Sequence, residues 1–236
     1  MRTYQYLRCN ILTMCDCAIV RVCGRYAIRS YEKPYINKNI MKNVTPSFIV
    51  GIGGSAGGLN AYKALLEALP SDTGMAFVFV SHLLPDASSQ LAHILSRNTE
   101  MPAMVAATAM GIWANHIYVI PPNADLFIEG SVFKVTSPRI KRNEQVDVFF
   151  TSLAEAMGKR AIGIILSGYN GDGTEGCKQI KAKGGVTFAQ DESAQISHMS
   201  LSAQLAGCVD FVLPPKKIAE ELIRLANNNK SMLNNL

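Results

Sequence analysis

The sequence is poor in three features that would each define a class of protein: paired cysteines, long apolar runs and charge of one sign. Six cysteines occur in 236 residues, and only Cys177 and Cys208 lie beyond residue 46. So few cysteines in a chain of this length argue against a disulfide-stabilised fold. The other four match no spacing of zinc ligands, so we expect unpaired thiols and no metal site: Cys9, Cys15, Cys17 and Cys23.

Apolar residues never form a run long enough to span a membrane, which needs roughly 20 of them in succession. The apolar stretch at residues 11–20 has the position of a signal peptide, but Asp16 interrupts it. Arg21 and Arg25 then stand where small residues would mark a cleavage site. We therefore expect a cytoplasmic protein.

The net charge of +5 is confined to the beginning of the chain. Residues 1–46 contain eight lysines and arginines against two acidic residues, whereas residues 47–236 contain fifteen against sixteen. The body therefore lacks the basic surface of a nucleic-acid-binding domain, and we expect no nucleic-acid partner. The pattern predicts a poorly structured leader at 1–46, one domain at 47–226 and a C-terminal tail at 227–236, with Met41 as the hypothetical native start.

Along the body, apolar segments typical of buried strands alternate with segments of helical periodicity. This alternation predicts an α/β fold, in which a doubly wound, mostly parallel sheet carries helices on both faces. Residues 125–128 and 131–136 flank Glu129-Gly130 and predict a β-hairpin insertion. Strands are expected at 48–50, 75–80, 117–120, 161–166, 186–189 and 211–213, and helices at 59–69, 90–97, 146–157, 174–183, 199–206 and 217–226.

Three polar residues follow predicted strands, at the positions where open α/β sheets place their ligand sites. Ser55 follows the first strand, His82 the second, and Asp172 the strand at 161–166. A serine hydroxyl is a weak nucleophile at neutral pH, so it needs a base to take its proton and a carboxylate to orient that base. One of each at the same edge of a sheet predicts a serine hydrolase.

Ser55 lies in Gly53-Gly54-Ser55-Ala56-Gly57, which matches the G-x-S-x-G turn that exposes a nucleophile between a strand and a helix. The glycines permit a sharp turn, and the start of the helix points backbone N–H groups at a developing oxyanion. Taken alone, however, this loop favours Ser55 as the N-cap of the following helix over Ser55 as a nucleophile.

The same loop also contains G-x-G-x-x-A, from Gly51 to Ala56, a pattern that binds the pyrophosphate of a dinucleotide. A dinucleotide site needs an acidic residue near the end of the second strand to hold the ribose. His82 stands there instead, while Asp72 comes too early and Asp86 too late. The nucleotide-binding alternative therefore lacks its ribose anchor, and we expect no cofactor.

His82 and Asp172 each have a simpler interpretation. A histidine at a strand end is often a structural hydrogen-bonding group, and Asp172 lies between Gly171 and Gly173, where a turn residue is common. Catalytic roles are favoured because both residues, like Ser55, follow predicted strands of one sheet. The remaining histidines fit the role of a catalytic base less well, since they lie within a helix or in turns: His93, His116 and His198.

At these residues the chain resembles the catalytic domain of the CheB-type protein-glutamate methylesterases of chemotaxis, over about residues 47–226. The resemblance rests on blocks in collinear order: VGIGGSAGGL at 50–59, VSHLLP at 80–85, IYVIPP at 117–122, VDVFF at 146–150, ILSG at 165–168, NGDG at 170–173 and AQDE at 189–192. It implies that Ser55 is the nucleophile, His82 the base and Asp172 the acid that orients the base. It also implies an oxyanion and substrate pocket at Gly54, Ala56 and Tyr169.

The family removes methyl groups from glutamate esters on membrane chemoreceptors and deamidates receptor glutamines, through an acyl-serine and without a metal or cofactor. The resemblance therefore implies a hydrolase that acts on the cytoplasmic helices of methyl-accepting chemoreceptors. A receptor methyltransferase is a second implied partner, and the membrane is reached only through the receptor. A catalytically weak signalling module of the same fold is the alternative from another functional class.

Three residues depart from the family pattern: Ala56 replaces a frequent threonine, Tyr169 a usual methionine and Ser200 a usual proline. We expect the phenol of Tyr169 to reshape the substrate pocket. Regulated members also carry a receiver domain of about 120 residues, and a leader of residues 1–46 is too short for a domain of that size. We therefore expect no direct control by phosphorylation. The SAGGL opening at 55–59 is most similar to modules fused ahead of a receptor methyltransferase.

Overall fold

The computed structural model describes residues 44–82 and 88–234 of the chain. These residues belong to one structural unit that begins at Lys42. The leader cysteines, Met41 and Asp86 lie outside the described residues. Within the two ranges, no helix combines the length and the apolar character needed to cross a membrane.

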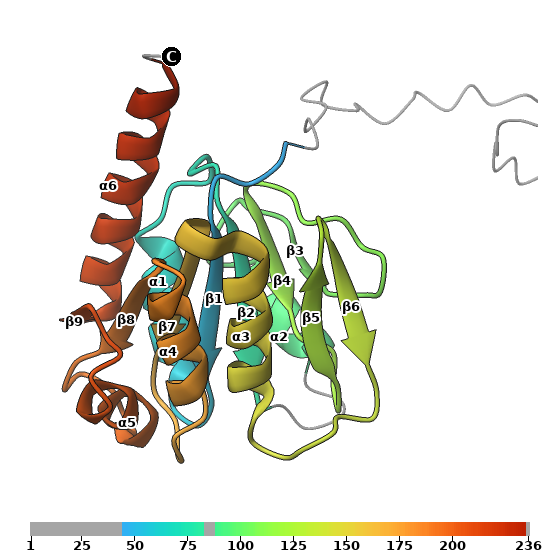
Figure 1. Cartoon of the computed structure of the whole chain (residues 1–236), viewed down its shortest axis with the longest axis vertical. Helices are drawn as coiled ribbons and strands as arrows, with labels where there is room; N and C mark the ends of the chain where they lie inside the picture. Colours follow the sequence, from blue (N-terminus) through green and yellow to red (C-terminus); the bar gives the residue numbers. More distant parts are fainter. Residues whose placement is uncertain (1–43, 83–87, 235–236) are drawn as a thin grey trace, which may run out of the picture. The chain divides into compact units, whose positions relative to one another are not determined.

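A seven-stranded sheet forms the centre of this unit (Figure 1). All of its pairings are parallel, as expected for strands that alternate with helices. The order β3-β4-β2-β1-β7-β8-β9 places β1 between β2 and β7, at the point where the winding of the chain changes direction. The strands are β1 (Ile49–Gly54), β2 (Ala76–Ser81), β3 (Ala103–Val105), β4 (His116–Val119), β7 (Ala161–Ile165), β8 (Val186–Gln190) and β9 (Phe211–Leu213).

Helices cover both faces of the sheet, and this confirms the predicted doubly wound α/β fold. On one face lie α1 (Gly58–Glu67), α2 (Ser88–Leu95) and α6 (Pro215–Asn234). On the other lie α3 (Gln145–Met157), α4 (Thr174–Ala182) and α5 (His198–Leu205), together with a 3-10 turn at Gly158–Arg160. The predicted hairpin is also present, since β5 (Asp125–Glu129) pairs with β6 (Val132–Thr136) in antiparallel register.

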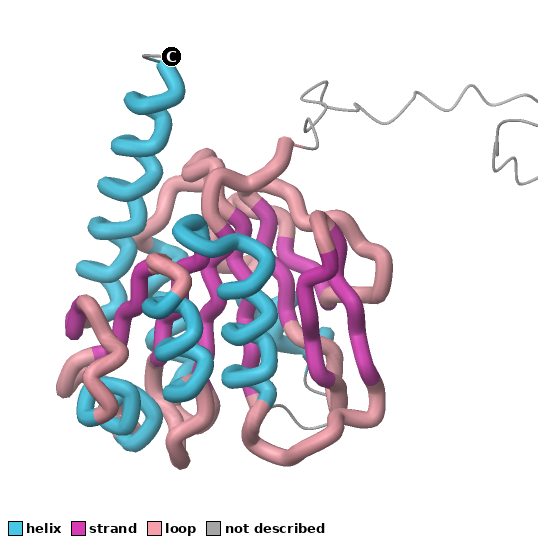
Figure 2. The backbone as a smooth tube through the Cα atoms, in the orientation of Figure 1, coloured by secondary structure: helices cyan, strands magenta, loops and turns pink. Residues whose placement is uncertain are grey.

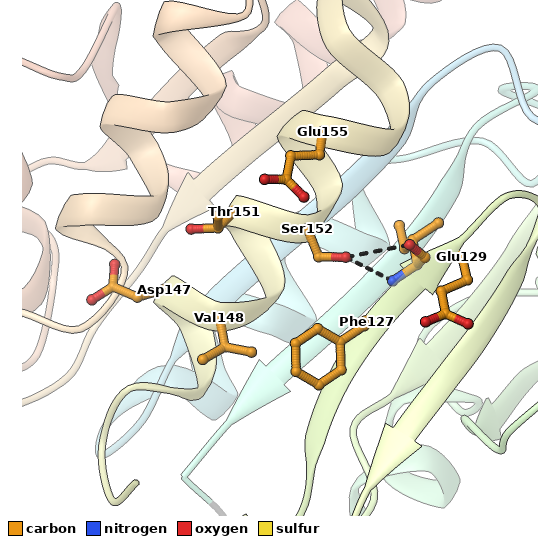
Figure 3. Close-up of a pocket in the computed structure, with 8 residues that line it drawn as sticks. Phe127, Glu129, Asp147, Val148, Thr151, Ser152 and Glu155 are labelled. Carbon is orange, nitrogen blue, oxygen red and sulfur yellow. Dashed lines mark hydrogen bonds between the residues drawn. The ribbon is translucent and has the colours of Figure 1, made fainter. Parts of the chain in front are cut away.

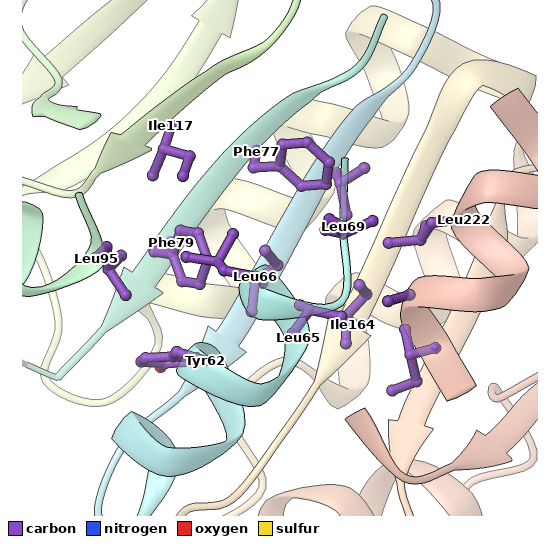
Figure 4. Close-up of a cluster of buried hydrophobic side chains, with 14 of the residues drawn as sticks. Tyr62, Leu65, Leu66, Leu69, Phe77, Phe79, Leu95, Ile117, Ile164 and Leu222 are labelled. Atoms are coloured by element: carbon purple, nitrogen blue, oxygen red, sulfur yellow. The ribbon is translucent and has the colours of Figure 1, made fainter. Parts of the chain in front are cut away.

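The alternation of side chains along β1 and β2 separates two apolar cores. Val50 and Phe77 belong to the first core, which lies under α1 and α6. Figure 4 shows Phe77 there with Leu65 and Leu222. The second core lies under α3, α4 and the hairpin, and Phe149 belongs to it. Each fully buried side chain of this size contributes about 1.5–3 kcal/mol by leaving water.

The sheet is rich in glycine where α3 packs on it. A Cβ on Gly51 would lie 2.7 Å from a ring carbon of Phe150, and a Cβ on Gly163 would lie 3.1 Å from the same ring. Because these positions carry no side chain, α3 packs directly against the backbone of β1 and β7. This close packing fixes where the first turn of α3 stands relative to the end of β1.

Two elements differ from the sequence prediction. The short edge strand β3 was not among the predicted strands, and α6 continues beyond Ala226 through Asn234, into the segment predicted as a tail. The asparagines at 227–229 have low helix propensity, which is why the pattern predicted an earlier end. Lys230 donates from Nζ to the carbonyl of Asp72 at 3.2 Å, a tertiary contact that no local pattern reveals.

Candidate active site

The three predicted catalytic residues lie at the carboxyl edge of the sheet. Ser55 follows β1, His82 follows β2, and Asp172 stands between β7 and α4. Because β1 pairs with both β2 and β7, the strand that presents the serine is flanked by the strands that present the other two residues. In Figure 2 the loops that follow β1 and β7 lie together at the lower edge of the sheet.

The turn that carries Ser55 is held by backbone groups. Its N–H donates to the carbonyl of Ser167 at 2.9 Å, and its carbonyl accepts from the N–H of Gly58 at 3.0 Å. Gly57 closes the turn with φ of 75°, a left-handed conformation that favours glycine. Gly57 is also the N-cap of α1, and no side chain caps that helix. The interpretation of Ser55 as the N-cap is therefore wrong.

Ser167 connects this turn to a second loop. Its buried hydroxyl donates to the carbonyl of Ala56 at 2.9 Å and accepts from the N–H of Ile196 at 3.0 Å. Its neighbour Gly168 is so close to the turn that an added Cβ would lie 3.1 Å from the Cβ of Ser55. Sequence reasoning missed both residues, although their place directly after a central strand is the signal that points to them.

Behind the turn, a buried hydroxyl pair fixes the last residue of β1. Ser81 donates from Oγ to the carbonyl of Gly54 at 2.7 Å, and the hydroxyl of Tyr62 lies 2.9 Å from the same Oγ. Burial raises the pKa of Tyr62 to about 12, so its phenol stays neutral. Gly54 has no room for a side chain, because a Cβ there would lie 2.5 Å from the Tyr62 hydroxyl oxygen.

His82 and Asp172 form a close pair. His82 Nε2 lies 2.6 Å from Asp172 Oδ2, and the side chains are 10% and 0% exposed. Since a carboxylate only accepts hydrogen bonds, Nε2 carries the proton of this bond, and Nδ1 is left with a free lone pair. A histidine in this state can take a proton from a hydroxyl at Nδ1 while Asp172 holds the ring.

Asp172 is itself fixed by two backbone donors. Its Oδ2 accepts from the N–H of Val146 at 3.1 Å, and its Oδ1 accepts from the N–H of Asp147 at 2.9 Å. Both donors belong to the first turn of α3, where the helix dipole favours a negative charge. Asp172 is therefore a buried, fully engaged carboxylate rather than a residue that merely completes a turn.

Within residues 44–82 and 88–234, no hydrogen bond joins the hydroxyl of Ser55 to His82. The structure thus brings His82 and Asp172 into contact. Ser55 stands at the end of the adjacent strand and is half-buried. Such bonds often tighten only when substrate is bound. Ala56, next along the turn, is exposed at the same edge.

Tyr169 stands at the rim of this edge. It is 57% exposed, and its ring packs edge-on against the ring of His198, with centroids 5.7 Å apart. His198 begins α5, so this contact connects the loop after β7 to the helix whose Met199 packs beneath Gly168. The phenol is therefore largely open to solvent on the loop that follows β7.

A concavity of the surface lies apart from these three residues. A groove of about 460 Å³ runs between α3 and β5, and Ser152 bonds across it to the backbone of Ile128 (Figure 3). Ser55, His82 and Asp172 do not line it. Asp147 belongs to both regions, since it is among the residues that line the groove and its N–H binds Asp172.

Comparisons with known proteins agree with this geometry. Residues 50–222 match the sequence model of the CheB methylesterase family. A protein-glutamate methylesterase/protein-glutamine glutaminase from Hydrogenovibrio crunogenus is 32% identical over 184 residues, which are 75% of this chain and 49% of that protein. A relative from Leptospira interrogans, provisionally given the same pair of activities, is 37% identical over 182 residues, or 75% of this chain and 94% of the relative.

The solved structure of the Thermotoga maritima CheB methylesterase catalytic domain matches with a TM-score of 0.70 and 28% identity. The match covers 75% of this chain and 98% of that one. These comparisons support the methylesterase interpretation over the nucleotide-binding and the signalling-module alternatives. The chain belongs to the CheB methylesterase family.

Proposed function

We propose that Ser55, His82 and Asp172 form the catalytic triad of a protein-glutamate methylesterase. The observation that carries this proposal is the 2.6 Å contact between His82 and the buried Asp172, beside the strand that ends at Ser55. The relatives described above are named for this activity, which supports the choice of a glutamate methyl ester as substrate.

In the first half of the reaction, Ser55 Oγ attacks the ester carbonyl while His82 Nδ1 takes the hydroxyl proton. Asp172 stabilises the imidazolium that forms. His82 then returns the proton to the departing methoxide, and methanol leaves an acyl-serine. In the second half, water gives a proton to His82 and attacks the acyl group, so that glutamate is released and Ser55 regains its proton.

The developing oxyanion needs donors that are already in place. The proposed pocket consists of the turn at Gly54 and Ala56 and the rim at Tyr169. The bonds from the Ser55 N–H and the Ser167 hydroxyl support this role, because they hold the turn rigid before substrate arrives. The same site can deamidate glutamine, since ammonia then replaces methanol as the leaving group.

The CheB family implies chemoreceptor substrates. We propose that the ester lies on the cytoplasmic helices of a methyl-accepting receptor, and that the enzyme works in the cytoplasm and reaches the membrane only through this receptor. A receptor methyltransferase is the proposed second partner, since it would supply the esters that this enzyme removes.

The test uses Ser55→Ala and a fluorophosphonate probe. The wild-type protein is expected to release methanol from receptor-bearing membranes with labelled methyl esters, and to react with the probe at Ser55. The variant should do neither. Methanol release by Ser55→Ala at the wild-type rate would overturn the assignment, and a folded wild-type protein that neither reacts nor releases methanol would favour the signalling module.

A further inference from the structure

Helices α3 and α4 begin side by side, and neither has a side-chain cap of its own. The N-cap residue of α3 is Glu144, whose side chain makes no capping bond, and the N-cap residue of α4 is Gly173, which has no side chain to make one. The first turn of any helix leaves backbone N–H groups without partners inside the helix. These groups must be satisfied from elsewhere, because both helix starts are packed into the structure.

Two aspartates satisfy them in a crossed arrangement. Asp172, which precedes the N-cap residue Gly173 of α4, accepts from the N–H groups of Val146 and Asp147 in α3. Asp147, in the first turn of α3, accepts from the N–H of Gly176 in α4 at 2.8 Å. Each helix thus caps its neighbour.

The close approach of the helices makes this arrangement rigid. A Cβ on Gly176 would collide with Phe150 and would lie 3.2 Å from the Cα of Asp147. Gly173, with φ of 96°, has Val146 and Ile165 in the space where a Cβ would be. The start of α4 therefore lies against the start of α3 at backbone distance, and Asp147 is the side chain from α3 that bonds to the backbone of α4.

We propose that Asp147 is a positioning residue for ester hydrolysis, because it holds the start of α4 where the preceding Asp172 meets His82. This inference rests on the proposed function. Asp147 makes no hydrogen bond to His82 in the described residues, so any effect on the reaction passes through Asp172 and the two helix starts.

The experiment compares three substitutions at Asp147 in steady-state hydrolysis of a peptide with a glutamate γ-methyl ester. Asp147→Asn keeps an oxygen that can accept from Gly176, Asp147→Ser keeps a shorter acceptor, and Asp147→Ala keeps none. We expect kcat to fall by about tenfold to a hundredfold in Asp147→Ala with KM almost unchanged, because a small displacement of a catalytic group lowers the rate without removing substrate contacts. Asp147→Asn should recover most of the rate, and Asp147→Ser should lie between.

Glu175→Ala is the matched control. Glu175 is an acidic residue in the first turn of α4, but its side chain is exposed and pairs with Lys178. Its removal changes the charge near Asp147 without removing a cap, so kcat should stay near the wild-type value. If Asp147→Ala fails to fold, the inference is tested by the two remaining variants: kcat should be higher in Asp147→Asn than in Asp147→Ser.

The inference is overturned if Asp147→Ala retains the wild-type kcat, if Asp147→Asn is as slow as Asp147→Ala, if Asp147→Ser is as fast as Asp147→Asn, or if only KM changes. Failure of the proposed function has a different signature. In that case the wild-type protein itself releases no methanol, or Ser55→Ala releases as much as the wild type, whatever the variants at Asp147 do.

Discussion

The two halves of the proposed active site are held in place in different ways. The turn around Ser55 is held by hydrogen bonds to backbone carbonyls. The N–H of Ser55 donates to the carbonyl of Ser167, and the N–H of Gly58 donates to the carbonyl of Ser55. The pair of His82 and Asp172 is held by side-chain carboxylate oxygens that reach across helices. The Ser55 turn therefore depends on glycines that leave room for close backbone packing, whereas the second half depends on the carboxylates of two specific aspartates, Asp147 and Asp172.

The largest effect is expected from Asp172→Asn, which alters the pair of His82 and Asp172. The Asp172 carboxylate accepts from three N–H groups, on His82, Val146 and Asp147, whereas an asparagine offers one acceptor oxygen and an amide that donates. His82 would lose the partner that fixes its tautomer. We expect kcat for methyl ester hydrolysis to fall by about 10⁴-fold with little change in the fold.

Glu155→Gln is the control for this change, since it neutralises a carboxylate of α3 that lines the groove and makes no bond to His82 or Asp172. It should leave kcat unaltered. A rate for Asp172→Asn within tenfold of the wild type would mean that His82 does not need the carboxylate.

A smaller effect is expected from Ser167→Ala, which attacks the turn. It removes the bond to the Ala56 carbonyl and leaves the N–H of Ile196 without its partner. A buried group left unpaired costs about 1–3 kcal/mol, measured as the loss in free energy of unfolding by urea titration. Because the turn also loses a restraint, we expect kcat to fall by about tenfold.

Ser152→Ala separates stability from positioning. Its hydroxyl also bridges backbone groups, of Ile128, but on the groove side of α3. It should cost similar stability and leave kcat unchanged. Equal losses of kcat in Ser152→Ala and Ser167→Ala would show that the turn has no special role.

The smallest effect concerns pH. Burial, and then the charges of Asp172 and Glu175, raise the pKa of Asp147 from 3.8 to about 6, although the N–H of Gly176 opposes the shift. The folded protein therefore binds a proton more tightly than the unfolded chain, and stability from this group falls as pH rises from about 4 to about 6. Lys178, which faces Glu175, is the nearby cation that moderates the effect.

The measurement is the free energy of unfolding by urea at pH 5 and at pH 7. The free energy of unfolding at pH 5 minus that at pH 7 should be larger in the wild type than in Asp147→Asn. The other carboxylates are common to both proteins, so they do not contribute to this comparison. An identical pH dependence in the two proteins would contradict the raised pKa of Asp147.

The fold and the pair of His82 and Asp172 could be predicted from the sequence because both depend on order along the chain. Parallel strands end at one edge, so residues after them converge whatever the loops do. The N-cap interpretation of Ser55 failed for a local reason: Gly57, not Ser55, takes the left-handed conformation that begins α1. The motif gave the residues of the turn but not the place where the helix starts.

The crossed caps could not be predicted, because they join residues about 25 positions apart through the packing of two helices. Asp147 in isolation has the pattern of an ordinary acid in a first helical turn. Ser167 gave no signal beyond its place after a strand. Neither the length of α6 nor the edge strand β3 has a local signal either, since tertiary contacts decide both.

The bare glycine face beneath α3 has a consequence for mutational scanning of this protein. Alanine is normally the mildest replacement, yet at Gly51, Gly53 and Gly163 a methyl group would enter space already filled by Phe150, Val146 and Ile180. A screen for activity would therefore score these positions as essential, although none of them can touch an ester. A mutational study of residues in this sheet must therefore measure the amount of folded protein as well as the rate of turnover.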